Sequence, residues 1–188
     1  MDKPSLPSQL HELSMNRKEY ELLDQQFVKE RNKVAQDPWR LGYHIMPESG
    51  WLNDPNGLCQ LHGHYHIYYQ YSPFDAEGNT KLWGHMTTKD FISYQQEEPV
   101  LYPDQRMDAR GVYSGSAFRL GDELYFFYTG NVKLFDQEDY DYVHQGREQN
   151  TILVTSKDGY VFSEKECLMS NEDYPAGMSC HIRDPKII

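Results

Sequence analysis

The feature that most constrains the fold is a similarity between two stretches of the chain, each rich in Tyr, Phe, Ile, Val and Thr. Gly57-Leu-Cys-Gln-Leu resembles Gly115-Ser-Ala-Phe-Arg-Leu, and Thr88-Lys-Asp-Phe resembles Ser156-Lys-Asp-Gly. Such runs, separated by Gly, Asp, Asn and Pro, are typical of antiparallel strands. A four-strand unit that repeats at this period is the pattern of β-propeller blades, in which each unit buries its faces against its neighbours.

The runs predict eight strands in an all-β fold. We expect them near 57–62, 64–71, 82–88, 92–96, 114–120, 123–130, 151–156 and 160–166. The second pair of similar segments lies further apart than the first, which indicates an insertion between 133 and 150. We therefore expect about two blades and the start of a third after Asp184, since a propeller closes with about four to eight blades. A two-sheet sandwich is the alternative.

The start of the chain differs from the rest. Residues 1–13 contain two prolines and no periodic pattern, which predicts an irregular arm. Residues 16–36 lack Gly and Pro and consist mainly of helix formers, so we expect a helix that ends before Pro38. The predicted division is an N-terminal arm and helix over 1–39 and a partial catalytic propeller over 40–188.

Composition excludes several classes of protein. The 188 residues carry a formal net charge of -11, which argues against nucleic acid as a partner. Aromatic residues make up 14%, more than disordered chains contain. No apolar run approaches the roughly 18 to 20 residues that cross a membrane, and the first residues lack the core of a signal peptide. Three cysteines without a close pair indicate neither a disulfide framework nor a zinc ribbon. We expect a cytoplasmic protein with no membrane partner.

Two Asp-Pro dipeptides are the candidates for chemistry. Asp54-Pro55 and Asp184-Pro185 each precede a predicted first strand of a blade. With Gly57, the first dipeptide fits a type I turn, which is the structural interpretation. If the first strands start at the same end of the channel, however, the two carboxylates face each other across its mouth. Carboxylates placed in this way indicate glycoside chemistry.

Five motifs follow one another along the chain: Trp51-Leu-Asn-Asp-Pro-Asn-Gly, Tyr68-Tyr-Gln70-Tyr, Trp83-Gly-His85, Tyr113-Ser114-Gly-Ser116-Ala and Arg183-Asp184-Pro185. Their order and approximate spacing make the chain, from about residue 40 to 188, similar to glycoside hydrolase family 32, which comprises invertases, fructanases and bacterial sucrose-6-phosphate hydrolases. The helical start and the absence of a signal peptide make the chain most similar to the intracellular sucrose-6-phosphate hydrolases of bacteria. The resemblance implies the N-terminal part of a five-bladed propeller that acts on sucrose 6-phosphate or sucrose.

The resemblance also implies a role for individual residues. Asp54 matches the nucleophile that forms a covalent fructosyl-enzyme, and Asp184 matches the stabiliser of the transition state. Arg183 beside Asp184 is expected to favour its ionised form. Trp83 is expected to form an apolar wall beside the sugar ring. Substrate contacts are implied for Trp51, Asn53, Gln70, Trp83, Tyr113, Ser114 and Arg183, and neither a cofactor nor a metal ion is implied.

The general acid of the family is absent from the expected place. Family members carry it in a Glu-Cys motif well downstream of Arg-Asp-Pro, and this sequence ends four residues after Asp184. Glu166-Cys167 has the dipeptide but lies upstream, so we interpret Glu166 as an ordinary strand carboxylate. The isolated chain is therefore expected to be inactive, and a truncated sugar-binding fragment is the alternative function. Its exposed blade edges are expected to cause self-association.

Other candidate sites are weaker. His62, His64 and His66 alternate as metal ligands on a strand would, but Gly63 predicts a hairpin turn there. Ser114 lacks the flanking glycines of a serine hydrolase nucleophile. The acidic run 136–141 lacks the glycine of a calcium loop and is interpreted as a solvated loop. His85 and His181 are expected to have structural or supporting roles.

Overall fold

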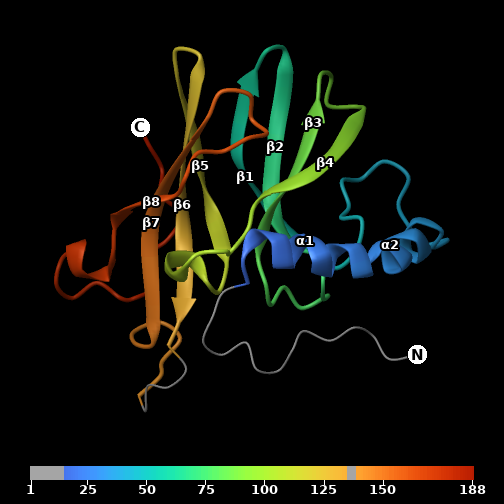
Figure 1. Cartoon of the computed structure of the whole chain (residues 1–188). Helices are drawn as coiled ribbons and strands as arrows, with labels where there is room; N and C mark the ends of the chain where they lie inside the picture. The colour runs from blue at the N-terminus through green and yellow to red at the C-terminus, as the bar shows by residue number, and fades with distance from the viewer. Residues whose placement is uncertain (1–14, 135–138) are drawn as a thin grey trace.

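The computed structural model of the chain describes residues 15–134 and 139–188 (Figure 1). The predicted arm over residues 1–13 lies outside the described residues. Two four-stranded antiparallel sheets form the body of the molecule, in the orders β1-β2-β3-β4 and β5-β6-β7-β8. The strands of the first sheet are β1 (Trp51–Leu61), β2 (His64–Ser72), β3 (Leu82–Thr88) and β4 (Tyr94–Leu101). Those of the second are β5 (Val112–Leu120), β6 (Glu123–Lys133), β7 (Arg147–Ser156) and β8 (Glu166–Met169). The prediction of two four-strand units is confirmed.

The predicted strands 92–96 and 160–166 are wrong in their bounds, for the same reason at both places. Asp90 accepts hydrogen bonds from the N–H groups of Ile92 and Ser93, at 2.9 and 2.8 Å, so the chain turns there and β4 begins only at Tyr94. In the second sheet, Asp158 binds the N–H groups two and three residues further on in the same way. A carboxylate that caps its own following backbone competes with strand pairing.

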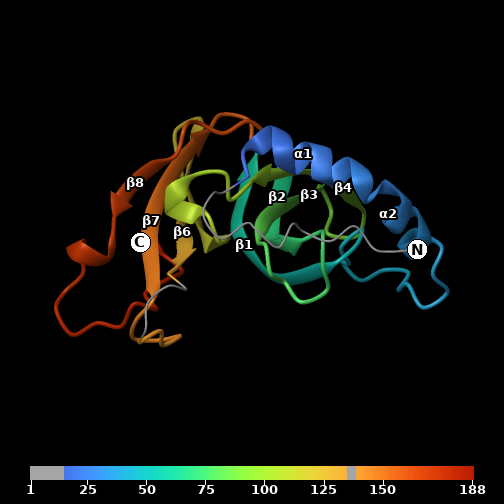
Figure 2. The same cartoon turned by 60° about the horizontal axis from the view of Figure 1, so that its bottom comes forward.

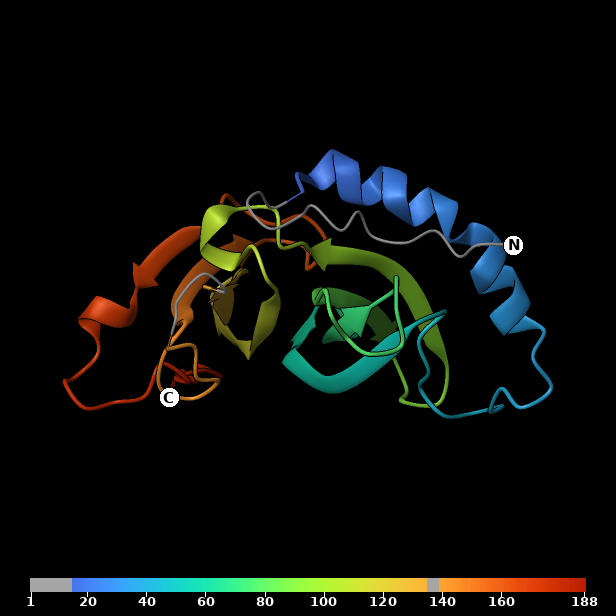
Figure 3. The ribbon, with the colours of Figure 1, turned by 90° about the horizontal axis from the view of Figure 1, so that it is seen from below.

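Two helices cover one edge of the first sheet. They are α1 (Arg17–Gln26) and α2 (Val28–Ala35), and short 3-10 helices follow at η1 (Arg106–Asp108) and η2 (Asn171–Asp173). Figures 2 and 3 show the helices beside β4. Tyr20 of α1 and Phe27, which lies between the two helices, are buried and pack against Phe74, with ring centroids 6.3 and 5.3 Å apart. The helices thereby shield the outer edge of this sheet. Within the described residues, no helix is long and apolar enough to cross a membrane.

The two sheets pack on each other through aromatic side chains. Tyr68 and Trp83 of the first sheet contact Phe126 of the second at ring-centroid distances of 5.3 and 6.2 Å. The hydroxyl of Tyr68 donates to the carbonyl of Gly159 at 2.8 Å, so the polar end of this buried ring is satisfied. β1 and β5, each at the edge of its own sheet, lie side by side where the two sheets meet. Residues from both strands can therefore meet at one end of this interface.

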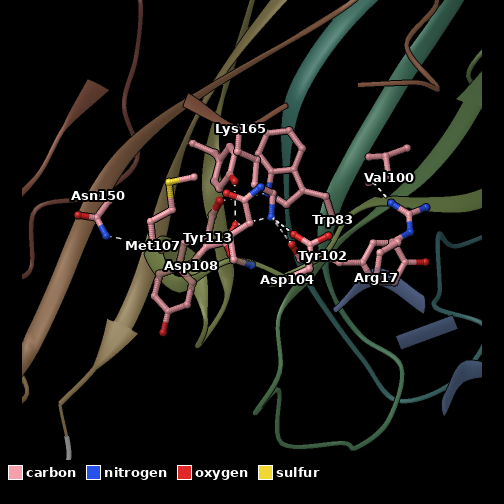
Figure 4. A network of polar contacts seen from close by, with 12 residues as sticks. Arg17, Trp83, Val100, Tyr102, Asp104, Met107, Asp108, Tyr113, Asn150 and Lys165 are labelled. Atoms are coloured by element: carbon pink, nitrogen blue, oxygen red, sulfur yellow. Dashed lines mark hydrogen bonds and ion pairs between the residues drawn. The ribbon is translucent and has the colours of Figure 1, made fainter. Parts of the chain in front are cut away.

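A buried ion network connects the segment between the sheets to the loop before β8 (Figure 4). The Lys165 ammonium group lies 2.5 Å from Asp104 and 2.6 Å from Asp108. Asp108 is fully buried and also accepts the hydroxyl of Tyr128 at 2.9 Å. Burial raises the pKa of Asp108, and the charge of Lys165 opposes this effect. The network fixes the position of the second sheet relative to the connection from the first.

Candidate active site

A polar cavity of about 190 Å³ opens where β1 and β5 meet the segment that contains residues 183–184. Its lining residues are Asn53, Asp54, Gln70, Lys81, Tyr113, Ser114, Arg183 and Asp184. Seven of these eight are residues that the sequence predicted as part of the site, and Lys81 is the addition. The two predicted catalytic carboxylates, Asp54 and Asp184, lie in the same cavity although 129 residues separate them in the sequence.

Asp54 reaches the cavity because β1 is irregular at this point. The pairing of β1 with β2 shifts between Leu52 and Pro55, so Asn53 and Asp54 lie in a bulge outside the regular ladder. A second shift follows Asn56, where Gly57 has a φ of 57°. The predicted type I turn at Asp54–Gly57 is therefore wrong, because the motif belongs to β1 itself. The bulge frees the Asp54 side chain from the sheet and aims it at β5.

Hydrogen bonds from two elements bind the Asp54 carboxylate. The side-chain amide of Asn53 donates to Oδ1 at 2.9 Å, and the Ser114 hydroxyl from β5 donates to Oδ2. Donors of this kind restrict the orientation of the carboxylate. The two donors hold the Asp54 carboxylate in one orientation at the cavity.

Asp184 is held by the second sheet. Its backbone N–H donates to the hydroxyl of Thr129 on β6 at 3.0 Å, and Ser116 donates to the carbonyl of Pro185 at 2.8 Å. Asp184 has a φ of 60°, an unusual conformation for a residue other than glycine. The predicted first strand of a third blade after Asp184 is not formed, since residues 181–188 have no regular secondary structure.

The pKa of Asp184 is raised above its ordinary value. Burial is the largest cause, and the negative charge of Asp54 adds to it. Arg183, whose guanidinium lies 3.5 Å from the Asp184 carboxylate, lowers the pKa but does not outweigh burial. Arg183 thus favours the ionised form of Asp184, as expected, although burial leaves the pKa of Asp184 above its ordinary value. The charge of Asp54 thus acts on the ionisation of Asp184 across the cavity that both residues line.

Of Gln70, Trp51 and Trp83, which were all predicted to contact the substrate, only Gln70 lines the cavity. Gln70 on β2 is buried, lines the cavity and donates to the carbonyl of Val112 at 2.8 Å. Trp83 is fully buried in the core and does not line the cavity, so the expectation of an apolar wall beside the sugar is wrong. Its indole N–H donates to the carbonyl of Tyr113 at 3.0 Å, so it supports the lining from behind. Trp51 is half-buried and stands beside the cavity, against Lys81.

Lys81 is the lining residue that sequence reasoning missed. Its ammonium nitrogen lies 5.3 Å from the ring centroid of Trp51 and 5.4 Å from that of Tyr113, and it donates to the carbonyl of Gly78. Burial lowers the pKa of Lys81, and the charge of Lys133 adds to this effect. A lone lysine two residues before Trp83 has no local signature, and the contact of its backbone with β5 brings it to the cavity.

Glu166 is exposed on β8, the outer strand of the second sheet, and does not line the cavity.

The alternating histidines at the start of the first sheet have different environments. His62 lies in the turn between β1 and β2, as Gly63 predicts, while His66 is buried on β2. Nδ1 of His66 lies 3.0 Å from Nε2 of His85 on the neighbouring strand β3. Within residues 15–134 and 139–188, no group of three potential ligand side chains is close enough to hold a metal ion. Part of the acidic run 136–141 lies outside the described residues.

Two carboxylates and two carboxamides that converge in a polar cavity are groups suited to hold a sugar and to attack its anomeric carbon. The fold and the site therefore place the chain among the glycoside hydrolases. The family model for the N-terminal domain of glycosyl hydrolases family 32 matches residues 44–188. The chain belongs to this family.

Relatives and solved structures agree with this assignment. The chain is 39% identical over 178 residues to a sucrose-6-phosphate hydrolase of Bacillus subtilis, covering 94% of this chain and 34% of the relative. It is 35% identical to one of Streptococcus mutans, covering 84% and 31%. The fold matches the sucrose-6-phosphate hydrolase of Lactobacillus gasseri with a TM-score of 0.74 at 30% identity, covering 86% of this chain and 31% of that structure. The chain thus spans about a third of the length of the curated relatives it matches.

A second solved structure is an insect protein. The family 32 β-fructofuranosidase of Bombyx mori matches with a TM-score of 0.73 at 29% identity, over 93% of this chain and 35% of that one. A mutant of that enzyme has been determined in complex with sucrose.

Proposed function

We propose that residues 40–188 form the first part of the catalytic five-bladed propeller of a retaining β-fructofuranosidase, acting in the cytoplasm on sucrose 6-phosphate or sucrose. In the proposed division, residues 1–39 are a separate N-terminal segment, whose described part contains α1 and α2. The observation that carries this proposal is the meeting of Asp54 and Asp184 in one cavity, with two donors bound to Asp54. The relatives named sucrose-6-phosphate hydrolase support the choice of substrates.

In the proposed reaction, the carboxylate of Asp54 attacks the anomeric carbon of the fructosyl unit. The bond between this carbon and the bridging oxygen breaks, and a fructosyl-aspartate ester forms. Water then displaces Asp54 and releases fructose with retention of configuration. Asn53 and Ser114 hold the carboxylate in position before the attack, which reduces the reorganisation that the step requires.

Asp184 has a different task in this mechanism. Its carboxylate accepts hydrogen bonds from fructosyl hydroxyls and stabilises positive charge as the transition state gains oxocarbenium character. This task needs the ionised form, which Arg183 favours and burial opposes. The Gln70 amide and Tyr113, both part of the lining, are suited to bind further hydroxyls of the sugar.

The leaving oxygen must receive a proton from a general acid. Among the described residues, Asp54 and Asp184 are the only carboxylates that line the cavity. We propose that the acid comes from polypeptide outside this sequence, placed about 5–5.5 Å from the Asp54 carboxyl group, as retention requires. A separation in the inverting range would contradict the mechanism. Without this acid, about 10²–10⁴-fold of rate is lost, so the isolated chain of 188 residues is expected to be inactive.

A second candidate function is sugar binding without hydrolysis. It is favoured by the same lining, which offers binding groups and a nucleophile but no third carboxylate among the described residues. The intact mass of the protein from its native source separates the two functions. A mass well above 22.2 kDa favours the hydrolase, and a mass of 22.2 kDa favours the binding protein.

The activity test uses the protein as its source produces it. Release of glucose from sucrose, and of glucose 6-phosphate from sucrose 6-phosphate, is compared with release by the Asp54→Ala variant. Loss of the nucleophile is expected to lower kcat by at least about 10³-fold. Equal rates for the parent and the variant would contradict the proposed function. An inactive parent that still binds sucrose would support the binding protein.

A further inference from the structure

Positive charge gathers on one side of the cavity, although the chain as a whole is strongly acidic, with a formal net charge of -11. Lys81 and Arg183 line the cavity. Lys133 and Arg147 pair with each other across β6 and β7 of the second sheet, and Arg147 interacts with the lining residue Tyr113. We call Lys81, Lys133 and Arg147 the cationic cluster. In the part of the chain that the structure describes, neither Lys81 nor Arg147 forms an ion pair with a carboxylate.

Backbone contacts bring the members of the cationic cluster to the same end of the two sheets. The N–H of Val112 donates to the carbonyl of Lys81 at 2.9 Å, which joins the start of β3 to the start of β5. The N–H of Asn131 donates to the carbonyl of Gly111 at 3.0 Å, which joins the end of β6 to the same point. Lys133 and Arg147 influence the ionisation of Lys81, so the three charges lie within electrostatic reach of one another.

Arg147 is the most unusual member of the cluster, because only 2% of it is exposed. Its guanidinium lies 3.8 Å from the centroid of the Tyr142 ring and donates to Asn131 Oδ1 at 3.2 Å. Its Nε is buried with no hydrogen-bond partner. Arg147 also acts on the hydroxyl of Tyr113, a lining residue, whose pKa it lowers against the effect of burial. A buried cation without a carboxylate is costly, and a bound anion would offset that cost.

We propose that the cationic cluster binds the phosphoryl group of a sugar phosphate whose other end occupies the cavity. A phosphate monoester carries up to two negative charges and three acceptor oxygens, which suit two ammonium groups and a guanidinium. The inference rests on the proposed function, and it selects sucrose 6-phosphate over sucrose as the substrate. In this arrangement the cluster contacts the glucosyl 6-phosphate, while Asp54 and Asp184 act on the fructosyl unit.

The first test measures kcat/KM for sucrose 6-phosphate and for sucrose, with the protein as its source produces it. Lys81→Met and Lys133→Met are each expected to lower the ratio of the two values by about tenfold or more, since each removes one charge-assisted contact. Lys89→Met is the matched control, because Lys89 is exposed beyond the opposite end of β3. A proportional loss for both sugars in the two cluster variants would overturn the inference. Arg147 is left unchanged, because its removal would disturb the buried Asn131.

The second test measures binding of inorganic phosphate by calorimetry, which needs no catalysis. The parent is expected to bind phosphate, with binding at least about tenfold weaker in Lys81→Met and unchanged in Lys89→Met. If neither sugar is cleaved but phosphate binding depends on Lys81, the proposed function fails and the phosphate site stands. If both sugars are cleaved and the ratio is the same in the cluster variants as in the parent, the function stands and the site fails. Absence of phosphate binding by the parent would also overturn the site.

Discussion

At the scale of single residues, the candidate nucleophile depends on donors that come from two strands. Asn53 is the neighbour of Asp54 on β1, whereas Ser114 reaches it from β5 of the other sheet. A carboxylate held in this way loses little freedom when the substrate arrives. The Ser114 hydroxyl therefore makes the catalytic geometry depend on the packing between the two sheets.

Replacing Ser114 tests this dependence. We expect Ser114→Ala to lower kcat/KM by about 10- to 100-fold, because a hydrogen bond to a charged group is worth about 1.5–3 kcal/mol. The measurement is steady-state hydrolysis of sucrose 6-phosphate by the protein as its source produces it. Ser93→Ala, at an exposed position before β4, is the control and should leave kcat/KM unchanged. An active Ser114→Ala variant with parental kcat/KM would show that Asp54 needs no donor from β5.

His66 and His85 form a second residue-scale feature, a buried pair with their nitrogens 3.0 Å apart. Burial is the main cause that lowers the pKa of His85 to about 3, and the neighbouring His66 adds to it. The folded protein therefore keeps His85 neutral at a pH where the unfolded chain, with an ordinary pKa of 6.5, binds a proton. The stability that this neutral ring contributes is complete above pH 6.5 and is lost as the pH falls from 6.5 toward 3.

We accordingly expect the free energy of unfolding to fall with decreasing pH in this window. The slope that one such group adds is at most about 1.4 kcal/mol per pH unit. Chemical denaturation between pH 7 and pH 5 measures it, and His85→Gln should give a shallower dependence than the parent. His62→Gln, in the exposed turn after β1, should keep the parental slope. Parallel slopes for the parent and His85→Gln would contradict the assignment.

At the scale of elements, irregular segments rather than regular strand pairing position the two carboxylates of the cavity. The bulge in β1 presents Asp54, and the hydrogen bond from Asp184 to Thr129 fixes the segment on β6. The network of Lys165, Asp104 and Asp108 holds the loop before β8 against the connection between the sheets (Figure 4). These contacts lie outside the regular ladders, and each of them depends on a specific side chain.

Removing Lys165 should therefore destabilise the fold. We expect Lys165→Met to lower the free energy of unfolding by about 3–5 kcal/mol, because Asp108 is left as a buried carboxylate without its cation. Urea denaturation measures the change, with Lys157→Met as the control at an exposed position just after β7. Adding Asp104→Asn and Asp108→Asn to Lys165→Met should recover part of the loss, since no unpaired charge remains. A small effect of Lys165→Met on the free energy of unfolding would indicate that Lys165 does not pair with Asp104 and Asp108 in solution.

At the scale of the whole molecule, the two outer edges of the paired sheets differ. Helices α1 and α2 lie beside β4, as Figures 2 and 3 show. All four residues of β8 are exposed at the other edge, including Leu168 and Met169. An uncovered strand with apolar side chains offers backbone donors and acceptors to another chain.

We expect the 188-residue chain, produced on its own, to self-associate through this edge. Light scattering at micromolar concentration should give a mass above 22.2 kDa. Leu168→Lys, which places a charge on the edge, should shift the mass toward that of the monomer. Ile92→Lys, at an exposed apolar position beside the first sheet, should not. A monodisperse monomer of the parent chain would contradict this prediction.

The sequence by itself determined the all-β class and the two four-strand units, because both depend on local patterns of strand and turn residues. Seven of the eight cavity residues were named from the resemblance of short motifs to family 32, and the structure places these residues around one cavity. The strand bounds near Asp90 and Asp158 were missed because a side-chain cap there competes with pairing.

Only the tertiary structure decided which side chains share the cavity and in what state. Trp83 belongs to a motif, yet it is buried in the core, while Lys81 has no motif and lines the cavity. Burial likewise sets the pKa of Asp184, against the local effect of Arg183. The physical reason is the same in each case. Burial and proximity come from the pairing of strands far apart in the chain and from the packing of one sheet on the other, neither of which local sequence encodes.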